Sequence, residues 1–185
     1  MRRSACSSPI VRSDATRRNR DAAKIHGVEA RVETTEAFIV ATVDAALAAQ
    51  NAAVAAESMG LGICYLGGLR NHIEAVSELL GLPSLVYPVF GMTIGRPAEA
   101  PAPKPRLPRP VVYHEERYDV SRDAGLRAYD ETVRAYYRER TGGRREHGYR
   151  ELVARTLAEP RRAHMASYLK ARGFMHDRGD GCGNG

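Results

Sequence analysis

The distribution of hydrophobic and polar residues predicts a chain that contains both helices and strands. Glu33–Met59 is rich in alanine and almost free of charge in its second half, which predicts one long helix. A helix that is apolar nearly all round must be buried, either in a core or between subunits. Gly60 and Gly62 are expected to end this helix, and the β-prone run Ile63–Leu66 predicts a strand directly after it.

The rest of the pattern predicts a further strand and four more helices. A helix is expected over Asn71–Leu80, with Asn71 as its N-cap and Glu74 in capping-box register. Leu85–Gly95 predicts a strand. Arg96–Pro110 contains six prolines in fifteen residues, which predicts an extended segment because proline interrupts both helices and sheets. The remaining helices are expected at Asp123–Thr141, His147–Ala158 and Arg161–Arg172.

Composition narrows the class of protein. At 185 residues with 43% hydrophobic and 27% charged content, the chain is long enough for one globular domain with a real core. We expect no membrane association, because no apolar run approaches the roughly 20 residues that span a bilayer. The cysteines Cys6, Cys64 and Cys182 show no metal or redox spacing, which favours a reducing, cytoplasmic location.

The positive charge is unevenly distributed. The net charge is +6, and the first 31 residues carry eight Lys or Arg against three acids. One interpretation is nucleic-acid binding through phosphate neutralisation. The basic residues of the helical segments are interleaved with acids, however, and no groove-reading motif is present. Solvated helix faces and no nucleic-acid partner are therefore the favoured expectation.

The segment Ile63–Asn71, Ile-Cys-Tyr-Leu-Gly-Gly-Leu-Arg-Asn, is the most informative local motif. The predicted strand runs directly into Gly67 and Gly68, and glycines allow backbone amides to approach a flat or anionic ligand. A bare Gly-Gly turn before a helix more often has a purely structural role. The spacing is also not that of a Rossmann or P-loop fingerprint.

The order of the motifs around this turn is more specific. The upstream motifs are Val43–Asn51 and Ala55–Gly62, and the downstream motifs are Pro88–Pro97, Lys104–Pro108 and His114–Tyr118. The series resembles the nitroreductase superfamily, and in particular its oxygen-insensitive NADPH nitroreductases and NADPH–flavin oxidoreductases, which are FMN-containing homodimers. The resemblance implies an α+β, nitroreductase-like fold over residues 32–172, with a central sheet flanked by helices. The long alanine-rich helix would be buried where two protomers meet.

The resemblance also implies which residues contact the cofactors. Tyr65 and Leu66 would pack against the isoalloxazine ring, and the amides of Gly67 and Gly68 would face its N5 and O4 edge. An extended arm would reach the FMN with Lys104, Pro105 and Arg106, although the bottom-up alternative for this segment is a linker. Arg140 and Arg144, with Arg145 as an alternative to Arg144, would bracket the 2′-phosphate of NADPH. Cations that complement the dipole at a helix C-terminus are the plainer explanation for these arginines.

The implied activity is a two-step transfer of two electrons. NADPH would donate hydride to FMN and leave, and a nitroaromatic, a quinone or free flavin would then take its place. No side chain needs to act as acid, base or nucleophile, because the cofactor carries the chemistry. His72 and His114 are expected to be surface or structural residues and not catalytic ones.

The two ends of the chain depart from the family pattern. Members of this branch begin with a His-Arg-Ser-x-Arg motif that holds the FMN phosphate, and residues 1–31 contain no match to it. These residues are therefore interpreted as a basic, poorly matching segment of a family member that lacks its front portion. Residues 173–185 are rich in glycine and are expected to be disordered. The alternative function is a truncated, flavin-free and inactive remnant of such an enzyme.

Overall fold

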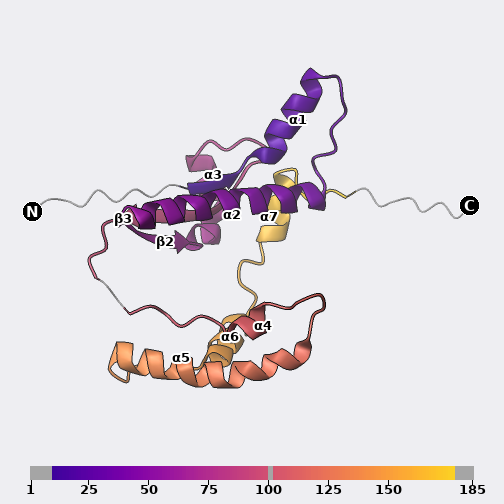
Figure 1. The fold of residues 1–185 in the computed structure, drawn as a ribbon. Helices are drawn as coiled ribbons and strands as arrows, with labels where there is room; N and C mark the ends of the chain where they lie inside the picture. Colours follow the sequence, from indigo (N-terminus) through magenta and orange to yellow (C-terminus); the bar gives the residue numbers. More distant parts are fainter. Residues whose placement is uncertain (1–9, 100–101, 178–185) are drawn as a thin grey trace, which may run out of the picture. The chain divides into compact units, whose positions relative to one another are not determined.

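A computed structural model describes residues 10–99 and 102–177 of the chain. The composition predicts one globular domain, whereas the chain divides into two compact units. The first unit takes in Met1–Ala98 together with Arg162–Gly185, and the second takes in Glu99–Arg161. Figure 1 shows the helices and strands of both units.

The first unit is built on a three-stranded sheet with the strand order β1-β3-β2 and antiparallel pairing throughout. Strands β2 (Gly62–Leu66) and β3 (Tyr87–Gly95) confirm the two predicted strands, with β3 beginning two residues later than expected. In their ladder Tyr65 lies opposite Met92, and Leu66 lies opposite Gly91. Strand β1 (Ile10–Ser13) and helix α1 (Ala15–Ile25) lie in a segment for which the sequence pattern predicted no element.

Helix α2 (Thr35–Ser58) confirms the predicted long helix and lies across the sheet, in contact with all three strands (Figure 1). Thr34 is the N-cap of this helix, and its hydroxyl accepts a hydrogen bond from the Ala37 N–H at 3.2 Å. Within the single chain only alanines of α2 are fully buried, so the predicted burial is not provided by the core of its own unit. Five of its larger apolar side chains are between 46% and 60% exposed: Ile39, Val40, Val43, Leu47 and Val54.

The same helix corrects the expectation that no segment is long and apolar enough to span a bilayer. By length and composition alone α2 passes that test, with a mean hydropathy of 1.5 over its best window, of which 17% is buried in the unit. The core helix of a soluble protein also passes this test. The criterion therefore does not distinguish a membrane helix from one that packs against another protein surface.

The core of the first unit is an aromatic cluster that joins segments far apart in the sequence. The ring of Phe38 on α2 lies 5.4 Å from that of Tyr87 on β3, and Phe174 lies 5.6 and 5.5 Å from these two rings. The Tyr87 hydroxyl lies 2.6 Å from Oγ1 of Thr42. Around this cluster pack helices α3 (Ile73–Leu79) and α7 (Met165–Ala171), through Ile73, Tyr168 and Leu169.

The position of Phe174 shows that the prediction of disorder from Gly173 onward is wrong for residues 173–177. The side chain of Phe174 is 0% exposed. Beyond it the His176 N–H donates to the Glu33 carbonyl at 2.8 Å, and the Asp177 carboxylate accepts from the Thr35 N–H at 2.9 Å. The first turn of α2 is therefore tied to the C-terminal segment, while residues 178–185 lie outside the described part of the chain.

The second unit is helical. It contains α4 (Arg109–Val112), the short 3-10 helix η2 (Val120–Ala124), α5 (Gly125–Thr141) and α6 (Tyr149–Leu157). Helices α5 and α6 confirm two predicted helices with ends that differ by one or two residues. The predicted helix Arg161–Arg172 shortens to α7 of the first unit, and α4 begins within the segment that was expected to be extended.

Helices α5 and α6 are joined by a buried carboxylate. Asp130 of α5 is 4% exposed and accepts from the Arg150 N–H at 2.9 Å and from Arg150 Nε at 2.5 Å. Arg150 is the second residue of α6, so Asp130 caps the N-terminus of that helix. Gly148 makes this approach possible, since a Cβ there would lie 3.0 Å from Asp130 Oδ1. These bonds, the backbone N–H of Arg150 first, lower the pKa of the Asp130 carboxyl.

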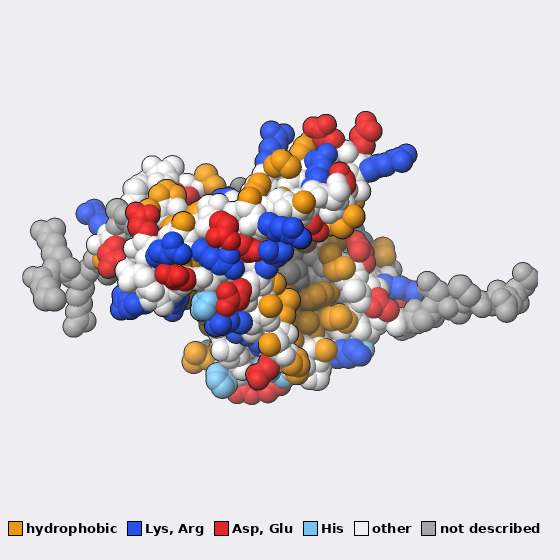
Figure 2. Space-filling model, turned by 90° about the horizontal axis from the view of Figure 1, so that it is seen from below, with side chains coloured by type: hydrophobic (Ala, Val, Ile, Leu, Met, Phe, Trp, Pro, Cys, Tyr) orange, Lys and Arg blue, Asp and Glu red, His pale blue; other side chains and the backbone are white. Residues whose placement is uncertain are grey.

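Charged side chains on the face drawn in Figure 2 are mixed, with Lys and Arg beside Asp and Glu. Ion pairs join Arg134 to Glu131 and Arg155 to Glu151, at 2.5 and 2.9 Å respectively. Exposed pairs of this kind contribute at most about 1 kcal/mol each. They have the pattern expected of solvated helix faces.

We expect Asp130→Asn to lower the free energy of unfolding by about 1–3 kcal/mol, because the cap of α6 loses its charge. The pKa of Asp130 is lowered from its ordinary value of 3.8, so its contribution is present above that pH and is lost as the pH falls through the folded-state pKa. Urea unfolding at pH 7 and pH 3 measures both effects. Glu131→Gln, at the adjacent exposed residue, is the control and should change stability by less than about 0.5 kcal/mol. Equal effects of the two substitutions at pH 7 would contradict the capping role.

Candidate functional site

The Gly-Gly turn lies at the point where β2 leaves the sheet. Gly67 follows the last residue of β2 and has ordinary right-handed angles, with φ −80° and ψ −11°. A 3-10 helix, η1 (Gly68–His72), starts at the second glycine, and α3 follows at Ile73. The predicted helix Asn71–Leu80 is thus confirmed in shorter form as α3, but the predicted Asn71 cap is wrong, since His72 occupies the N-cap of α3 and makes no capping bond through its side chain.

The C-terminal segment of the first unit makes hydrogen bonds to the residues that follow this turn. The Asn71 side chain, which was expected to cap a helix, instead accepts a hydrogen bond from Arg162 Nε at 2.8 Å. His164 Nε2 lies 2.9 Å from the Arg70 carbonyl oxygen. Both contacts join residues more than 90 positions apart in the chain, so no local pattern could have predicted them.

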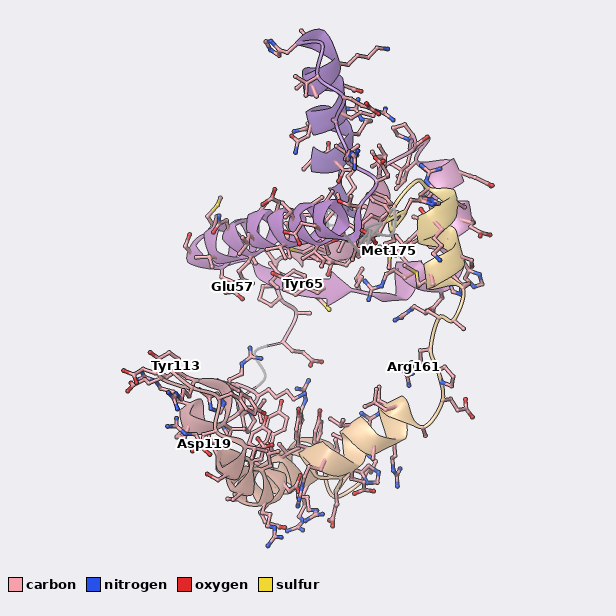
Figure 3. All side chains as sticks on the ribbon, turned by 90° about the vertical axis from the view of Figure 1, so that its right-hand side faces the viewer. Glu57, Tyr65, Tyr113, Asp119, Arg161 and Met175 are labelled. Atoms are coloured by element: carbon pink, nitrogen blue, oxygen red, sulfur yellow. The ribbon has the colours of Figure 1, made fainter. Side chains whose placement is uncertain are left out.

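An open cavity of about 380 Å³ lies beside the turn. It is lined by Ala46 and Gln50 of α2, Tyr65 of β2, Phe90 of β3, and Gly67 and Arg70. Tyr65, labelled in Figure 3, lies next to α2, and its hydroxyl donates to Gln50 Oε1 at 2.9 Å. The edge of one ring meets the face of the other between Tyr65 and Phe90, at 5.3 Å and 88°. The walls thus combine aromatic surface with an amide and a cation.

Of the four predicted flavin contacts in the first unit, only two face the cavity. Side chains alternate between the faces of a strand, so Tyr65 and Gly67 lie on the cavity side. Leu66 points to the other side, where its Cβ lies 3.5 Å from the position of a Cβ built on Gly91. Gly68 is exposed and does not line the cavity.

The fold itself does not require glycine at position 68. Neither Gly67 nor Gly68 has a positive φ, and a Cβ built on Gly68 would meet nothing within 4 Å. A Cβ on Gly67 would lie 3.1 Å from Arg70 Nη2. Among the described residues the Gly67 N–H has no backbone acceptor. The turn therefore presents a free amide and a bare backbone surface, which suit the close approach of a planar ligand.

Arg70 is a residue of this site that the sequence pattern did not single out. Its Nη1 donates to the Val89 carbonyl of β3, which ties the turn to the sheet. Burial, followed by the nearby charge of Arg162, lowers the pKa of the Arg70 guanidinium. The only signal in the sequence was a single cation that follows two glycines. A half-buried guanidinium is costly unless it has a structural or ligand-binding use.

The predicted arm of Lys104, Pro105 and Arg106 belongs to the second unit, where it lies along α5. The Tyr129 hydroxyl donates to the Pro105 carbonyl at 2.9 Å. The Lys104 ammonium lies 5.6 Å from the centroid of the Tyr137 ring. Lys104 and Arg106 are exposed, so both cations remain accessible within this unit.

The predicted arginines at the end of α5 also belong to the second unit. Gly142 ends the helix in the left-handed conformation with φ +58°, and Gly143 follows with φ +79°, which explains why glycine occurs twice here. Arg140 Nη1 donates to the Tyr136 hydroxyl at 2.6 Å, and Arg144 Nε donates to the Thr141 carbonyl at 3.0 Å. By contrast, Arg138 is paired with Glu146 at 3.0 Å.

The structure thus assembles two groups of candidate residues. The first unit brings Tyr65 and Gly67 together with Gln50, Arg70 and Phe90. The second unit places Lys104 on Tyr137, next to the Tyr136–Arg140 pair. Sequence reasoning missed Gln50, Phe90 and Tyr136, because each looks like an ordinary residue of its helix or strand.

The remaining candidates have structural contacts. His114 Nδ1 accepts from the Asp119 N–H at 3.1 Å, and its ring stacks on Tyr118. Cys64 is free and exposed. The described residues contain no cluster of three side chains that is able to hold a metal ion. A larger hollow of about 620 Å³ lies between β1 and the alanine face of α2, away from the Gly-Gly turn.

Comparison with known proteins identifies the family to which this fold belongs. The model of the Nitroreductase family matches residues 20–96, and that of the Nitroreductase family, C-terminal domain matches residues 104–177. The structure of NfrA1 nitroreductase from B. subtilis superposes with a TM-score of 0.81 at 42% identity, over 87% of this chain and 67% of that one. The NADPH:FMN oxidoreductase from Vibrio harveyi, solved with NAD+, gives 0.72 at 32% identity, over 92% and 81%. The chain belongs to the nitroreductase family.

The match to curated sequences is shorter. The FMN reductase (NADPH) of Bacillus subtilis (strain 168) is 47% identical over 121 residues, which make up 64% of this chain and 49% of that protein. The chain therefore spans about half the length of the curated relatives that it matches. The resemblance inferred from the sequence motifs and the α+β nitroreductase fold are both confirmed.

We expect Gly68→Ala to raise the free energy of unfolding by about 0.4–1 kcal/mol, because a compatible Gly-to-Ala change reduces the entropy of the unfolded chain. Gly67→Ala should gain less, because its Cβ approaches Arg70 Nη2 and the guanidinium must shift. Urea unfolding of the flavin-free protein compares the two variants. A Gly68→Ala protein less stable than the wild type would show that the fold does need this glycine.

Proposed function

We propose that this protein is an FMN-dependent NADPH oxidoreductase that reduces nitroaromatics, quinones or free flavins. The observation that carries the proposal is the turn at Gly67, which presents glycine backbone to an open cavity with aromatic walls although its φ is not positive. The names of the relatives supply the cofactors, since they include an FMN reductase (NADPH) and an NADPH:FMN oxidoreductase.

The residues around the turn fit a flavin. The amides of Gly67 and Gly68 would donate to the N5 and O4 edge of the ring, where preorganised donors stabilise negative charge. Tyr65 would pack against the ring from the cavity wall, whereas Leu66 lies on the opposite face of β2 and is left out of this contact. On the second unit taken by itself, Lys104, Pro105 and Arg106 are proposed to bind a cofactor phosphate, because an ammonium and a guanidinium attract its negative charge. When bound, FMN takes two electrons as hydride from NADPH and passes them to the acceptor.

The nicotinamide dinucleotide is proposed to bind through Arg140 and Arg144. In the second unit neither guanidinium has a carboxylate within 4 Å among the described residues, whereas Arg134, Arg138 and Arg155 each have one. Unpaired guanidiniums beside a Gly-Gly turn are suited to a phosphate, which a planar fork of N–H groups binds in a bidentate way. No side chain of the chain needs to act as an acid or base in this scheme.

The exposed apolar side chains of α2 support a homodimer. Leu47 is 60% exposed and Val54 is 54% exposed, and Val40 and Val43 add to the same helix. A long helix with so much uncovered apolar surface is typical of an interface between subunits. A second copy of this chain would cover it. We accordingly propose a soluble, cytoplasmic dimer and not a membrane protein.

Adding FMN to the purified protein tests the activity. We expect one FMN per chain, a yellow protein, and oxidation of NADPH that depends on an added quinone or nitroaromatic. Gly67→Ala should weaken FMN binding about tenfold or more, because Gly67 lines the cavity and a Cβ there would take up space beside the ring. Leu79→Ala, an exposed position of α3, is the control and should bind FMN as the wild type does. A protein that stays colourless with excess FMN and does not oxidise NADPH would refute the proposal and favour a flavin-free remnant.

Placing a charge on α2 tests the dimer. We expect Leu47→Lys to convert the protein from dimer to monomer, because a lysine in an apolar interface loses its hydration without gaining a partner. Light scattering after gel filtration measures the mass. Leu157→Lys on α6, at a position 74% exposed, is the matched control and should remain dimeric. A wild-type mass of one chain would contradict the proposed assembly.

A further inference from the structure

Tyr136 lies at the cation-rich end of α5, and its contacts are not explained by packing. Its ring and that of Tyr137 meet edge to face, at 5.2 Å and 71°. Each ring carries a cation: the Arg140 guanidinium lies 5.9 Å from the centroid of Tyr136, and the Lys104 ammonium lies 5.6 Å from that of Tyr137. Each of these adjacent tyrosines of α5 therefore has a cation over its ring.

The two tyrosines differ in their hydroxyl groups. The Tyr136 oxygen accepts from Arg140 Nη1 at 2.6 Å, one helical turn further along α5. The Tyr137 hydroxyl has no hydrogen-bond partner among the residues that the structure describes, so Tyr137 supports Lys104 through its ring alone. The hydrogen bond that Arg140 donates to the Tyr136 hydroxyl also raises the pKa of the Arg140 guanidinium.

This contact restricts a side chain that would otherwise be mobile. Arg140 is exposed, and a free arginine loses rotamer entropy when a ligand fixes it. A bond that orients the guanidinium before binding removes part of that cost. Within the described part of the chain only one of the five N–H groups of Arg140 is used, and the others remain available. Because the Tyr136 oxygen accepts from Arg140, its own O–H is free to donate to the same ligand.

We propose that Tyr136 is a specificity-determining residue for the phosphate that distinguishes NADPH from NADH. It positions Arg140 and donates its own O–H to that phosphate, while Arg144 approaches from the far side of the Gly142–Gly143 turn. The inference rests on the proposed use of NADPH, and it adds a residue that neither charge nor motif would select. The predicted signature is selectivity for a 2′-phosphate that depends on one phenolic oxygen.

The test uses ligands that need neither flavin nor turnover. Adenosine 2′,5′-bisphosphate and 5′-AMP differ only in the 2′-phosphate, and their binding to the full chain is measured by titration calorimetry at fixed ionic strength. The wild type should bind the bisphosphate at least tenfold more tightly. Tyr136→Phe, which keeps the ring and removes the oxygen, should weaken binding of the bisphosphate about tenfold and leave that of 5′-AMP unchanged. Tyr137→Phe is the matched control and should alter neither.

Three results would overturn the inference: no preference for the bisphosphate in the wild type, an unchanged preference in Tyr136→Phe, or equal losses for the two ligands. Circular dichroism melting of each variant verifies the fold, and both phenylalanine variants should melt with the wild type. Failure of the proposed oxidoreductase activity would be seen in a separate measurement, as a protein that does not take up FMN. A flavin-free protein that still selects the 2′-phosphate through Tyr136 would sustain this inference on its own.

Discussion

The aromatic contact of Phe174 with Phe38 and Tyr87 is the constraint on which the first unit depends. The chain leaves this unit after Ala98 and returns at Arg162, so its last helix contributes to the core only if the return is anchored. Phe174 provides that anchor, because its side chain is completely buried between a helix and a strand from the first half of the chain. Removing a buried phenylalanine typically costs about 3–5 kcal/mol.

The Gly-Gly turn depends on the same return of the chain. Arg162 donates to Asn71, and His164 contacts the Arg70 carbonyl, just before α7 packs into the core. Arg70 in turn ties the turn to β3 through the Val89 carbonyl. The candidate flavin contacts are therefore positioned by a segment that follows them by about 90 residues. Neither Gly67 nor Gly68 adopts a positive φ in this arrangement.

The second unit positions its cations in a different way. Buried Asp130 links α5 and α6 and fixes the helix that carries the tyrosines, while pairs such as Arg138–Glu146 neutralise other arginines. Arg140 is held by a neutral phenol, which leaves its full charge for a ligand. Whether an arginine is available to a phosphate is thus decided by its neighbour and not by its position in a basic stretch.

The sequence by itself determined the elements with a strong local signal. Alanine content and a low density of charge specified α2, β-prone runs specified β2 and β3, and the motif order around Gly67 specified the family. Local signals failed where long-range contacts compete. Asn71 binds Arg162 instead of capping a helix, Phe174 is drawn into the core despite its glycine-rich surroundings, and β1 forms because β3 offers an open edge. Only the tertiary structure decided these points, because a hydrogen bond or a buried ring gains its free energy from a partner that the local sequence does not contain.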